Sequence, residues 1–352
     1  MKSIGKNKPN LLLFNLEIDS DSKVLAAGLD WVRSFSEYCE NVYVFSTHVG
    51  SYDLPKNVKV WELGGGGIYN KIRWVVMGFY SVLVCLRVKH PRIVFHHMSQ
   101  FTSIHPGLLF RLLSIKQGMW YAHAHKNLSL IIAEKIVNKT FTSAPGAFPV
   151  KSEKLMFLGQ GVNTDAFQKV FKSNRGEPRV GLISIGRINK SKNLDELLID
   201  LHEKNKLEIE FIGRNDNQEY FEYLTILAKN KGLKLELLSD KKYTDIPDFL
   251  IKRKYYFCGT RIAVDKAAIE AAASGCIIIS KNKNVLQLTG MIKIYSSLNI
   301  AIPESLQSQI KVFEELSLKR IEQIQGEISQ LTCELNNVKL TTKRVIDEIL
   351  SN

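Results

Sequence analysis

Short runs of β-branched and aromatic residues alternate with longer helix-like stretches, and this alternation limits the fold more than any other feature of the sequence. The expected strands cover 10–16, 41–46, 57–63, 92–96, 119–122, 140–143 and 154–158 in the first half, and 180–185, 208–212, 234–238, 255–258 and 276–280 in the second. The expected helices cover 24–38, 69–88, 106–113, 128–137, 194–204, 219–229, 264–274 and a broken stretch over 303–350. Continuously apolar strands such as 276–279 suit a sheet that helices cover on both faces. The pattern therefore predicts an α/β protein with doubly wound parallel sheets.

A polar stretch over 168–179, with Gly176 and Pro178, separates two α/β halves of similar size. At about 150 residues per domain, the length of 352 residues also predicts two domains. We expect an N-terminal Rossmann-like domain over 1–170, a second over 171–335, and a C-terminal helix over 336–352 that packs back on the first domain. Because such folds bind ligands at the carboxyl ends of their strands, we expect the site in a cleft between two facing domains.

The charge balance predicts an anionic partner, since 48 Lys and Arg stand against 35 Asp and Glu, a net charge of +13. The five cysteines show no zinc or redox spacing, so a reducing cytoplasm is the expected location. No cluster of His, Cys, Asp and Glu has a recognisable metal spacing. The basic residues are spaced out and form no known nucleic-acid module, so we expect no nucleic-acid partner.

A span without any acidic residue lies between Glu62 and Glu134, and it contains eight Lys and Arg residues. Its longest apolar run, 74–86, has 13 residues, whereas a helix that crosses a bilayer needs about 20. Apolar residues at helical spacing surrounded by cations suit a helix that lies on an anionic membrane surface. The alternative is a core helix with basic ends.

Arg187 and Lys192 lie in a strand-to-helix turn, where the positive end of a helix favours anions. Arg offers a fork of donors to phosphate oxygens, and Lys offers a point charge. Asn193 is placed to cap the following helix, with Glu196 as its capping-box partner. The alternative is a surface turn with solvated cations.

A helix rich in small residues runs from Asp265 to Gly275 and carries Glu270 in apolar surroundings, where it could hold sugar hydroxyls. Two simpler interpretations stand beside this one: Asp265 is an N-cap only, or Lys266 and Glu270 form a surface ion pair. His123 follows another expected strand, at an edge of the sheet where active sites gather, although most histidines are structural.

Together these segments resemble the retaining family-4 glycosyltransferases of GT-B fold, and most closely the bacterial subgroup that makes surface polysaccharides or exopolysaccharides. The resemblance covers about 300 residues and depends on the order and spacing of several motifs. They are Trp120-Tyr121-Ala122-His123, Gly161-Val162-Asn163-Thr164-Asp165-Ala166-Phe167, Gly186-Arg187-Ile188, Phe211-Ile212-Gly213-Arg214 and Glu270-Ala271-Ala272-Ala273-Ser274-Gly275.

The resemblance implies roles for particular residues. The expected catalytic residues are His123, Asp265, Arg187 and Lys192, and the expected donor-binding residues are Arg187, Lys192, Gly213, Arg214, Lys266, Ile269 and Glu270. In this scheme Arg187 and Lys192 bind the diphosphate, Glu270 holds the ribose, and His123 lies near the transferred sugar. Ile262 stands where the family often has a second Glu, and Asp265 is the candidate to replace that acid.

The resemblance implies a metal-independent hexosyltransferase without a cofactor. It would use a nucleotide-sugar donor and a lipid-linked or polysaccharide acceptor, in the cytoplasm or on the inner face of the plasma membrane. Two alternatives stay open. One is a nucleotide-sugar epimerase of the same fold, and the other is a non-catalytic subunit, which the isoleucine at position 262 favours.

Overall fold

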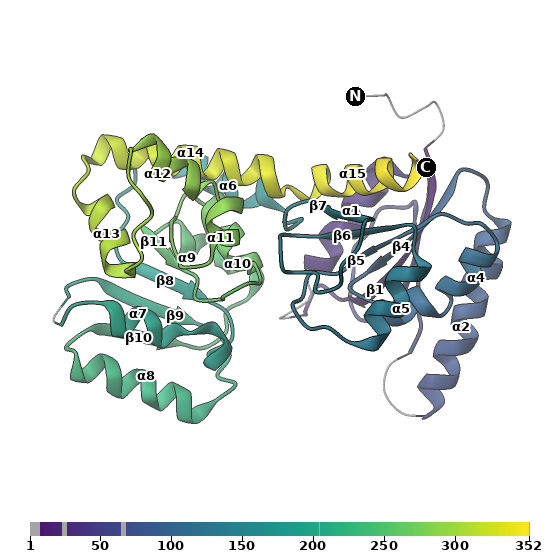
Figure 1. Ribbon diagram of the computed structural model, residues 1–352, viewed down its shortest axis with the longest axis horizontal. Coiled ribbons are helices and arrows are strands. Elements are labelled where there is room, and N and C mark those ends of the chain that lie inside the picture. Colours follow the sequence, from purple (N-terminus) through teal and green to yellow (C-terminus); the bar gives the residue numbers. More distant parts are fainter. Residues whose placement is uncertain (1–7, 23–26, 65–67, 204, 352) are drawn as a thin grey trace. The chain divides into compact units, whose positions relative to one another are not determined.

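The computed structural model describes residues 8–22, 27–64, 68–203 and 205–351, and they form two compact units (Figure 1). The first unit ends at Gly161 and is completed by the residues from Val338 onward, while Val162–Asn337 form the second. The expected boundary between residues 170 and 171 is therefore wrong, because it falls inside a helix of the second unit. The C-terminal residues from Val338 onward belong to the first unit.

The first unit contains a parallel sheet with seven strands among the described residues, in the order β3-β2-β1-β4-β5-β6-β7. The strands are β1 (Asn10–Ile18), β2 (Val42–Val49), β3 (Val58–Glu62), β4 (Arg92–His97), β5 (Gln117–Trp120), β6 (Lys139–Thr142) and β7 (Leu155–Phe157). The helices are α1 (Ala27–Tyr38), α2 (Ile68–Arg87), α3 (Gln100–Ile104), α4 (Gly107–Leu112), α5 (Leu128–Ile136) and α15 (Val338–Leu350). The order reverses beside β1, which pairs with both β2 and β4.

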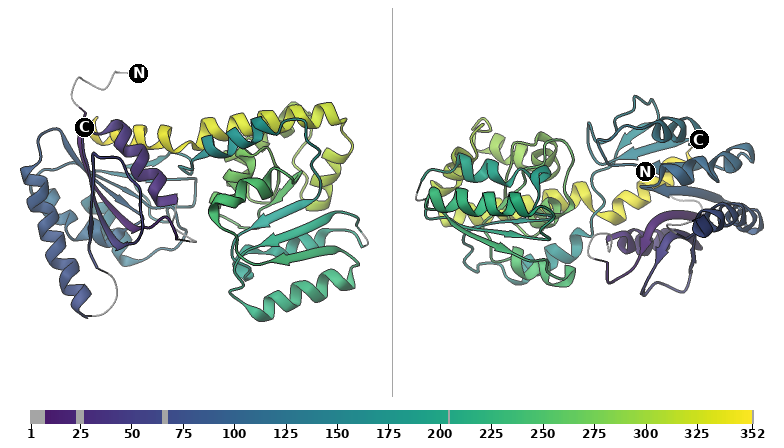
Figure 2. Two further views of the ribbon diagram at one scale, coloured as in Figure 1. Left: turned by 180° about the vertical axis from the view of Figure 1, so that it is seen from behind. Right: turned by 90° about the horizontal axis from the view of Figure 1, so that it is seen from below.

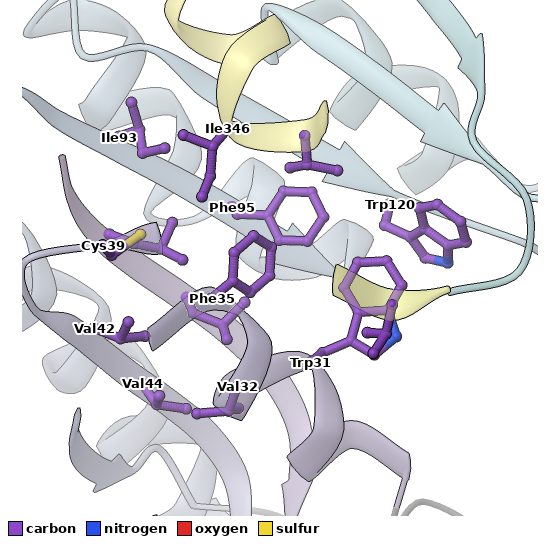
Figure 3. Packing of buried hydrophobic residues seen from close by; sticks show 14 of the residues in the cluster. Trp31, Val32, Phe35, Cys39, Val42, Val44, Ile93, Phe95, Trp120 and Ile346 are labelled. Atoms are coloured by element: carbon purple, nitrogen blue, oxygen red, sulfur yellow. The ribbon is translucent and has the colours of Figure 1, made fainter. Parts of the chain in front are cut away.

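Helices cover both faces of this sheet, as its continuously buried strands require. Leu11 and Leu13 of β1 contribute to the core under α1 and α15, whereas Leu12 and Phe14 contribute to the core under α2 and α4. Figure 3 shows the first of these cores, with aromatic side chains from α1, β4 and β5 packed beside Ile346 of α15. The C-terminal helix is thus part of the hydrophobic core of the first unit.

A buried histidine lies within this unit. His96 is completely buried, and its ring nitrogens lie 3.0 Å from Thr102 Oγ1 and 3.1 Å from Gln117 Oε1. Burial lowers the pKa of His96 to about 4, which a hydrogen bond to Gln117 opposes only in part. His96 is therefore a neutral core residue at physiological pH.

The second unit contains a parallel sheet with five strands among the described residues, in the order β10-β9-β8-β11-β12. The strands are β8 (Leu182–Ile185), β9 (Glu208–Ile212), β10 (Lys234–Leu238), β11 (Tyr255–Phe257) and β12 (Ile277–Ile279). The helices are α6 (Thr164–Ser173), α7 (Leu194–Asp200), α8 (Gln218–Asn230), α9 (Ile246–Leu250), α10 (Lys266–Ala273), α11 (Lys283–Leu288), α12 (Met291–Ser297), α13 (Leu306–Glu314) and α14 (Leu318–Asn336), with 3-10 turns η1 (Lys190–Lys192) and η2 (Tyr243–Asp245). The order reverses beside β8, between its neighbours β9 and β11.

The expected broken stretch over 303–350 consists of α13, α14 and α15, and it changes unit between Asn337 and Val338. Figure 2 shows the two sheets and their helices from two further sides. No helix among the described residues has both the length and the hydropathy that crossing a bilayer requires.

Candidate functional site

Two loops lie against each other at the carboxyl ends of β8 and β9. A Cβ atom on Gly213 would lie 1.8 Å from the carbonyl oxygen of Gly186, so this approach of the two backbones requires glycine. The loops also continue the pairing of their strands, since the Ile188 N–H donates to the carbonyl of Arg214 at 2.8 Å. This contact fixes the backbone on which Arg187 and Arg214 stand.

Asp216 lies between these two cations. Its carboxylate accepts a hydrogen bond of 2.6 Å from Arg214 Nε and lies 3.8 Å from Arg187 Nε. The hydrogen bond from Arg214 is the main cause that lowers the pKa of Asp216. Both arginine side chains are 56% exposed, so two half-exposed guanidinium groups share one carboxylate. Asp216 is not among the residues predicted from the sequence, although its position two residues after Arg214 was the available signal.

Lys192 and Asp265, two of the residues expected to be catalytic, form an ion pair. Lys192 Nζ donates to Asp265 Oδ1 at 2.8 Å and to Oδ2 at 2.7 Å, and the two side chains are 18% and 22% exposed. Cys258 Sγ lies 3.9 Å from the same carboxylate, and burial is the main cause that raises the pKa of this thiol to about 12. Asp265 precedes α10, but its side chain accepts hydrogen bonds from Lys192 and does not cap the N-terminus of the helix.

The expected capping box at Asn193 is wrong. Asn193 has a left-handed backbone with φ of 46°, and its side-chain amide donates to the carbonyl of Gly259 at 2.7 Å. The carboxylate of Glu196 instead accepts from Arg261. Asn tolerates the left-handed conformation better than most residues. Asn193 therefore ties the turn after β8 to the loop after β11.

Glu270 is a buried carboxylate on α10, with 5% of its surface exposed. The hydroxyl of Tyr243 in η2 donates to Glu270 Oε1 at 2.9 Å. Glu270 is therefore not a surface residue. Tyr243 is not among the residues predicted from the sequence, because 27 residues separate it from the carboxylate that it orients.

The structure gathers most of the predicted residues at one edge of the second sheet. Arg187 and Lys192 follow β8, Gly213 and Arg214 follow β9, and Asp265, Lys266, Ile269 and Glu270 follow β11. This edge includes the point where the strand order reverses, the usual ligand site of doubly wound sheets. The side chain of Ile269 is completely buried in the core. Ile262, where the resemblance implies that an acid is missing, is 47% exposed.

His123 belongs to the first unit and lies in the loop after β5. It is exposed, and its Nδ1 accepts a hydrogen bond of 3.1 Å from the His125 N–H. In the neutral ring this contact places the proton on Nε2, which is then a donor for an oxygen atom of a ligand.

The motif that begins at Gly161 has a structural role in the first unit. The indole N–H of Trp31 donates to the carbonyl of Gly161 at 2.8 Å. Gly161 has a φ of 63°, and a Cβ atom there would lie 2.3 Å from the Trp31 ring. The Trp31 ring in turn lies 4.5 Å from that of His97, whose Nδ1 lies 3.0 Å from Asn15 Oδ1.

One group of potential metal ligands occurs among the described residues. Glu17, Asp19 and His48 bring their ligand atoms within 4.8 Å of one another at the carboxyl ends of β1 and β2. Glu17 and His48 are register partners in the sheet, a proximity that their separation in the sequence hides. All three are exposed or half-buried, and such groups commonly occur without an ion.

No known family model matches the sequence, and no curated protein sequence matches it either. Solved structures do match along nearly the whole chain. The Anabaena protein HepE in complex with UDP is 11% identical, with 97% of this chain and 100% of that chain covered and a TM-score of 0.71. A glycosyltransferase from Rickettsia africae is 13% identical, with 98% and 99% covered and a TM-score of 0.69. The lipopolysaccharide outer core galactosyltransferase WaaB is 12% identical, with 97% and 99% covered and a TM-score of 0.62.

These similarities agree with the two parallel sheets described above. The chain has the GT-B fold, and its structural neighbours are glycosyltransferases.

Proposed function

We propose that the protein is a retaining family-4 glycosyltransferase that moves a hexose from a nucleotide-diphosphate sugar to a lipid-linked or polysaccharide acceptor in surface-polysaccharide synthesis. The observation that carries the proposal is the arrangement of Arg187, Arg214 and Lys192 at the carboxyl ends of β8 and β9, with the buried Glu270 on α10. The same edge of the sheet thus offers cations for a diphosphate and a carboxylate for hydroxyl groups.

The chemistry follows from the leaving group. Breaking the bond between the anomeric carbon and the phosphate oxygen places negative charge on the nucleoside diphosphate. The guanidinium groups of Arg187 and Arg214 and the ammonium of Lys192 stabilise that charge. Glu270, oriented by Tyr243, accepts hydrogen bonds from the ribose hydroxyls. In this proposal the three side-chain cations stabilise the leaving diphosphate without a metal ion.

Asp265 and Lys192 exchange partners in this scheme. In the free protein their charges neutralise each other across 2.7 Å. A bound diphosphate competes for the ammonium of Lys192, and the released carboxylate of Asp265 is then available to the hydroxyls of the transferred sugar. Asp265 would in this way supply the acid that Ile262 does not.

A uridine nucleotide is the donor that the comparisons favour. HepE has been crystallised with UDP, with UDP and glucose, and with UDP-glucose. We extend the preference for a uridine nucleotide to the present chain as part of the proposal. The proposal also includes a cytoplasmic location and an acceptor at the membrane or on a growing polysaccharide.

Thermal unfolding against UDP, GDP, ADP and CMP tests the donor site. A ligand at about 100 times its Kd stabilises the folded state by about 2.7 kcal/mol. We expect a shift with UDP that Arg187→Ala abolishes and that Lys234→Ala preserves, since Lys234 is an exposed cation on the distant edge strand β10. A shift of equal size in Arg187→Ala would refute the assignment of this residue.

A non-catalytic subunit is the second candidate, because Ile262 is exposed at the acid position and a carboxylate lies beside each of the three cations of the proposed diphosphate site. A non-catalytic subunit would show no shift in melting temperature with any nucleotide. An epimerase is distinguished by a separate measurement. If the protein converts a UDP-sugar when no acceptor fraction is added, the result would indicate an epimerase instead of a transferase.

A further inference from the structure

Helix α2 is apolar on two opposite faces. Its inner face contributes Val82 and Cys85 to the core under the sheet, with Trp74 and Met77 packed against them. Six residues of the opposite face have 42–59% of their surface exposed: Ile72, Val75, Val76, Phe79, Leu83 and Leu86. Their spacing of three and four residues places them on one side of the helix. We call these six residues the outer face of α2.

The exposed apolar surface continues onto neighbouring helices. The ring of His105, at the end of α3, lies 5.1 Å from that of Phe79, and His105 Nε2 donates to the carbonyl of Val75 at 3.1 Å. Phe101 of α3 is 59% exposed, and in α4 Leu108 and Leu112 are 50% and 74% exposed. Figure 1 shows α4 close to α2. Isolated exposed apolar residues are ordinary, but an apolar helix face that adjoins further exposed apolar helices marks an interaction surface.

Cations surround this surface. Arg73 lies near the first turn of α2, Arg87 ends the helix, and the exposed Lys89 and Arg111 follow on the next loop and on α4. Arg73 lies 3.3 Å from Glu62, and Glu62 is the last acidic residue before the acid-free span. A helix with an apolar outer face and basic ends matches a bilayer surface that carries anionic headgroups.

We propose that the outer face of α2 binds the surface of an anionic lipid bilayer, with the helix lying in the interface. At 1.5 Å per residue the helix is about 30 Å long, so its apolar side chains can enter the headgroup region along its length. A lipid surface explains the absence of acids better than a protein partner does, because a protein can place a cation opposite each acid, whereas anionic headgroups repel every one. Binding of this kind does not depend on the proposed donor chemistry.

Sedimentation with vesicles tests the proposal. The vesicles contain three parts phosphatidylcholine to one part phosphatidylglycerol, and pure phosphatidylcholine serves as the neutral reference. We expect binding to the anionic vesicles at about 0.05 M NaCl and release at about 1 M, where the Debye length falls to about 3 Å. The double variant Phe79→Ser/Leu83→Ser should bind about tenfold more weakly, because two apolar side chains no longer leave water.

A matched control removes similar apolar side chains from the second unit. Tyr223 and Ile226 of α8 are 44% and 58% exposed, so Tyr223→Ser/Ile226→Ser should bind the vesicles like the unchanged protein. Every variant should keep the UDP-dependent shift in melting temperature, if the unchanged protein has one. If Phe79→Ser/Leu83→Ser fails to fold, Arg87→Glu/Lys89→Glu provides the second test, and its binding at low salt should fall.

Three results would overturn the proposal. One is failure of the unchanged protein to bind anionic vesicles at low salt. Another is equal binding by the folded Phe79→Ser/Leu83→Ser variant. The third is self-association in light scattering that this variant abolishes, without any vesicle binding, which would assign the outer face of α2 to a second copy of the chain.

Discussion

Asp265→Asn should destabilise the second unit and at the same time increase its affinity for UDP. The carboxylate holds Lys192 Nζ at 2.7 and 2.8 Å, and both side chains are about four-fifths buried. Broken exposed pairs cost about 0–1 kcal/mol and broken buried pairs about 3–5 kcal/mol, so we expect a loss of about 2 kcal/mol here. For a unit of this size that loss lowers the melting temperature by about 4–8 °C.

The gain in affinity has a separate origin. A carboxylate about 4 Å from a phosphate oxygen repels it by about 1 kcal/mol in water, so removing the charge should tighten UDP binding about fivefold. Transfer activity should fall in the same variant, because the proposed contact of Asp265 with the sugar is lost.

Calorimetric titration with UDP and thermal unfolding measure the two effects independently. Glu315→Gln is the matched control, since Glu315 pairs with Lys311 at 3.7 Å while both side chains are about two-thirds exposed or more. It should change neither quantity by more than about 0.5 kcal/mol. A variant Asp265→Asn that melts like the unchanged protein and binds UDP more weakly would refute the argument, because the carboxylate would then be holding the ligand rather than Lys192.

Three further predictions concern other parts of the molecule. Gly161→Ala should destabilise the first unit by at least about 2 kcal/mol in chemical unfolding, since its Cβ would lie 2.3 Å from the Trp31 ring at a φ of 63°; an unchanged midpoint would contradict this. Stability should fall by up to about 3 kcal/mol as the pH drops from 6.5 to 4, because the lowered pKa of His96 makes the unfolded state bind the proton first; a similar pH dependence in a folded His96→Asn variant would exclude His96 as the cause. Treatment with EDTA should leave UDP binding and sugar transfer unchanged, and a loss that Mg²⁺ restores would show that side-chain cations alone do not suffice.

The two sheets could be predicted because their strands are short, apolar and separated by helical stretches, a local property that the sequence displays. The domain boundary could not be predicted in this way. Helix α6 appears polar in the sequence, yet Thr164, Phe167 and Phe171 are buried in the second unit, and Phe171 packs so closely on Gly275 that a Cβ there would lie 2.6 Å from its ring. This tertiary contact assigns the helix to the second unit and moves the boundary to Gly161.

The candidate site shows the same division. The positions of Arg187 and Arg214 follow from the ends of β8 and β9, which are visible as patterns. The contact of Asp216 with Arg214 is also local, since two residues separate them. The positions of Tyr243 and Gly259 could not be predicted, because they meet Glu270 and Asn193 through loop geometry that sequence spacing does not encode. The sequence contains a cap motif at Asn193 and therefore predicts a helix cap there. It does not show that the carbonyl of Gly259, in a neighbouring loop, binds the same side chain.

The position of α15 in the core of the first unit has a consequence for biosynthesis. The strands β1–β7 are made before the second unit, but Ile346 and Ile349, which cover one face of their sheet, are made after it. The second unit, about 180 residues, is translated in between, which at about 5–20 residues per second takes roughly 10–35 s. During that interval the apolar groove beside Phe35, Ile93 and Phe95 is open to chaperones and proteases. A fragment that stops after residue 161 would retain this exposed groove permanently.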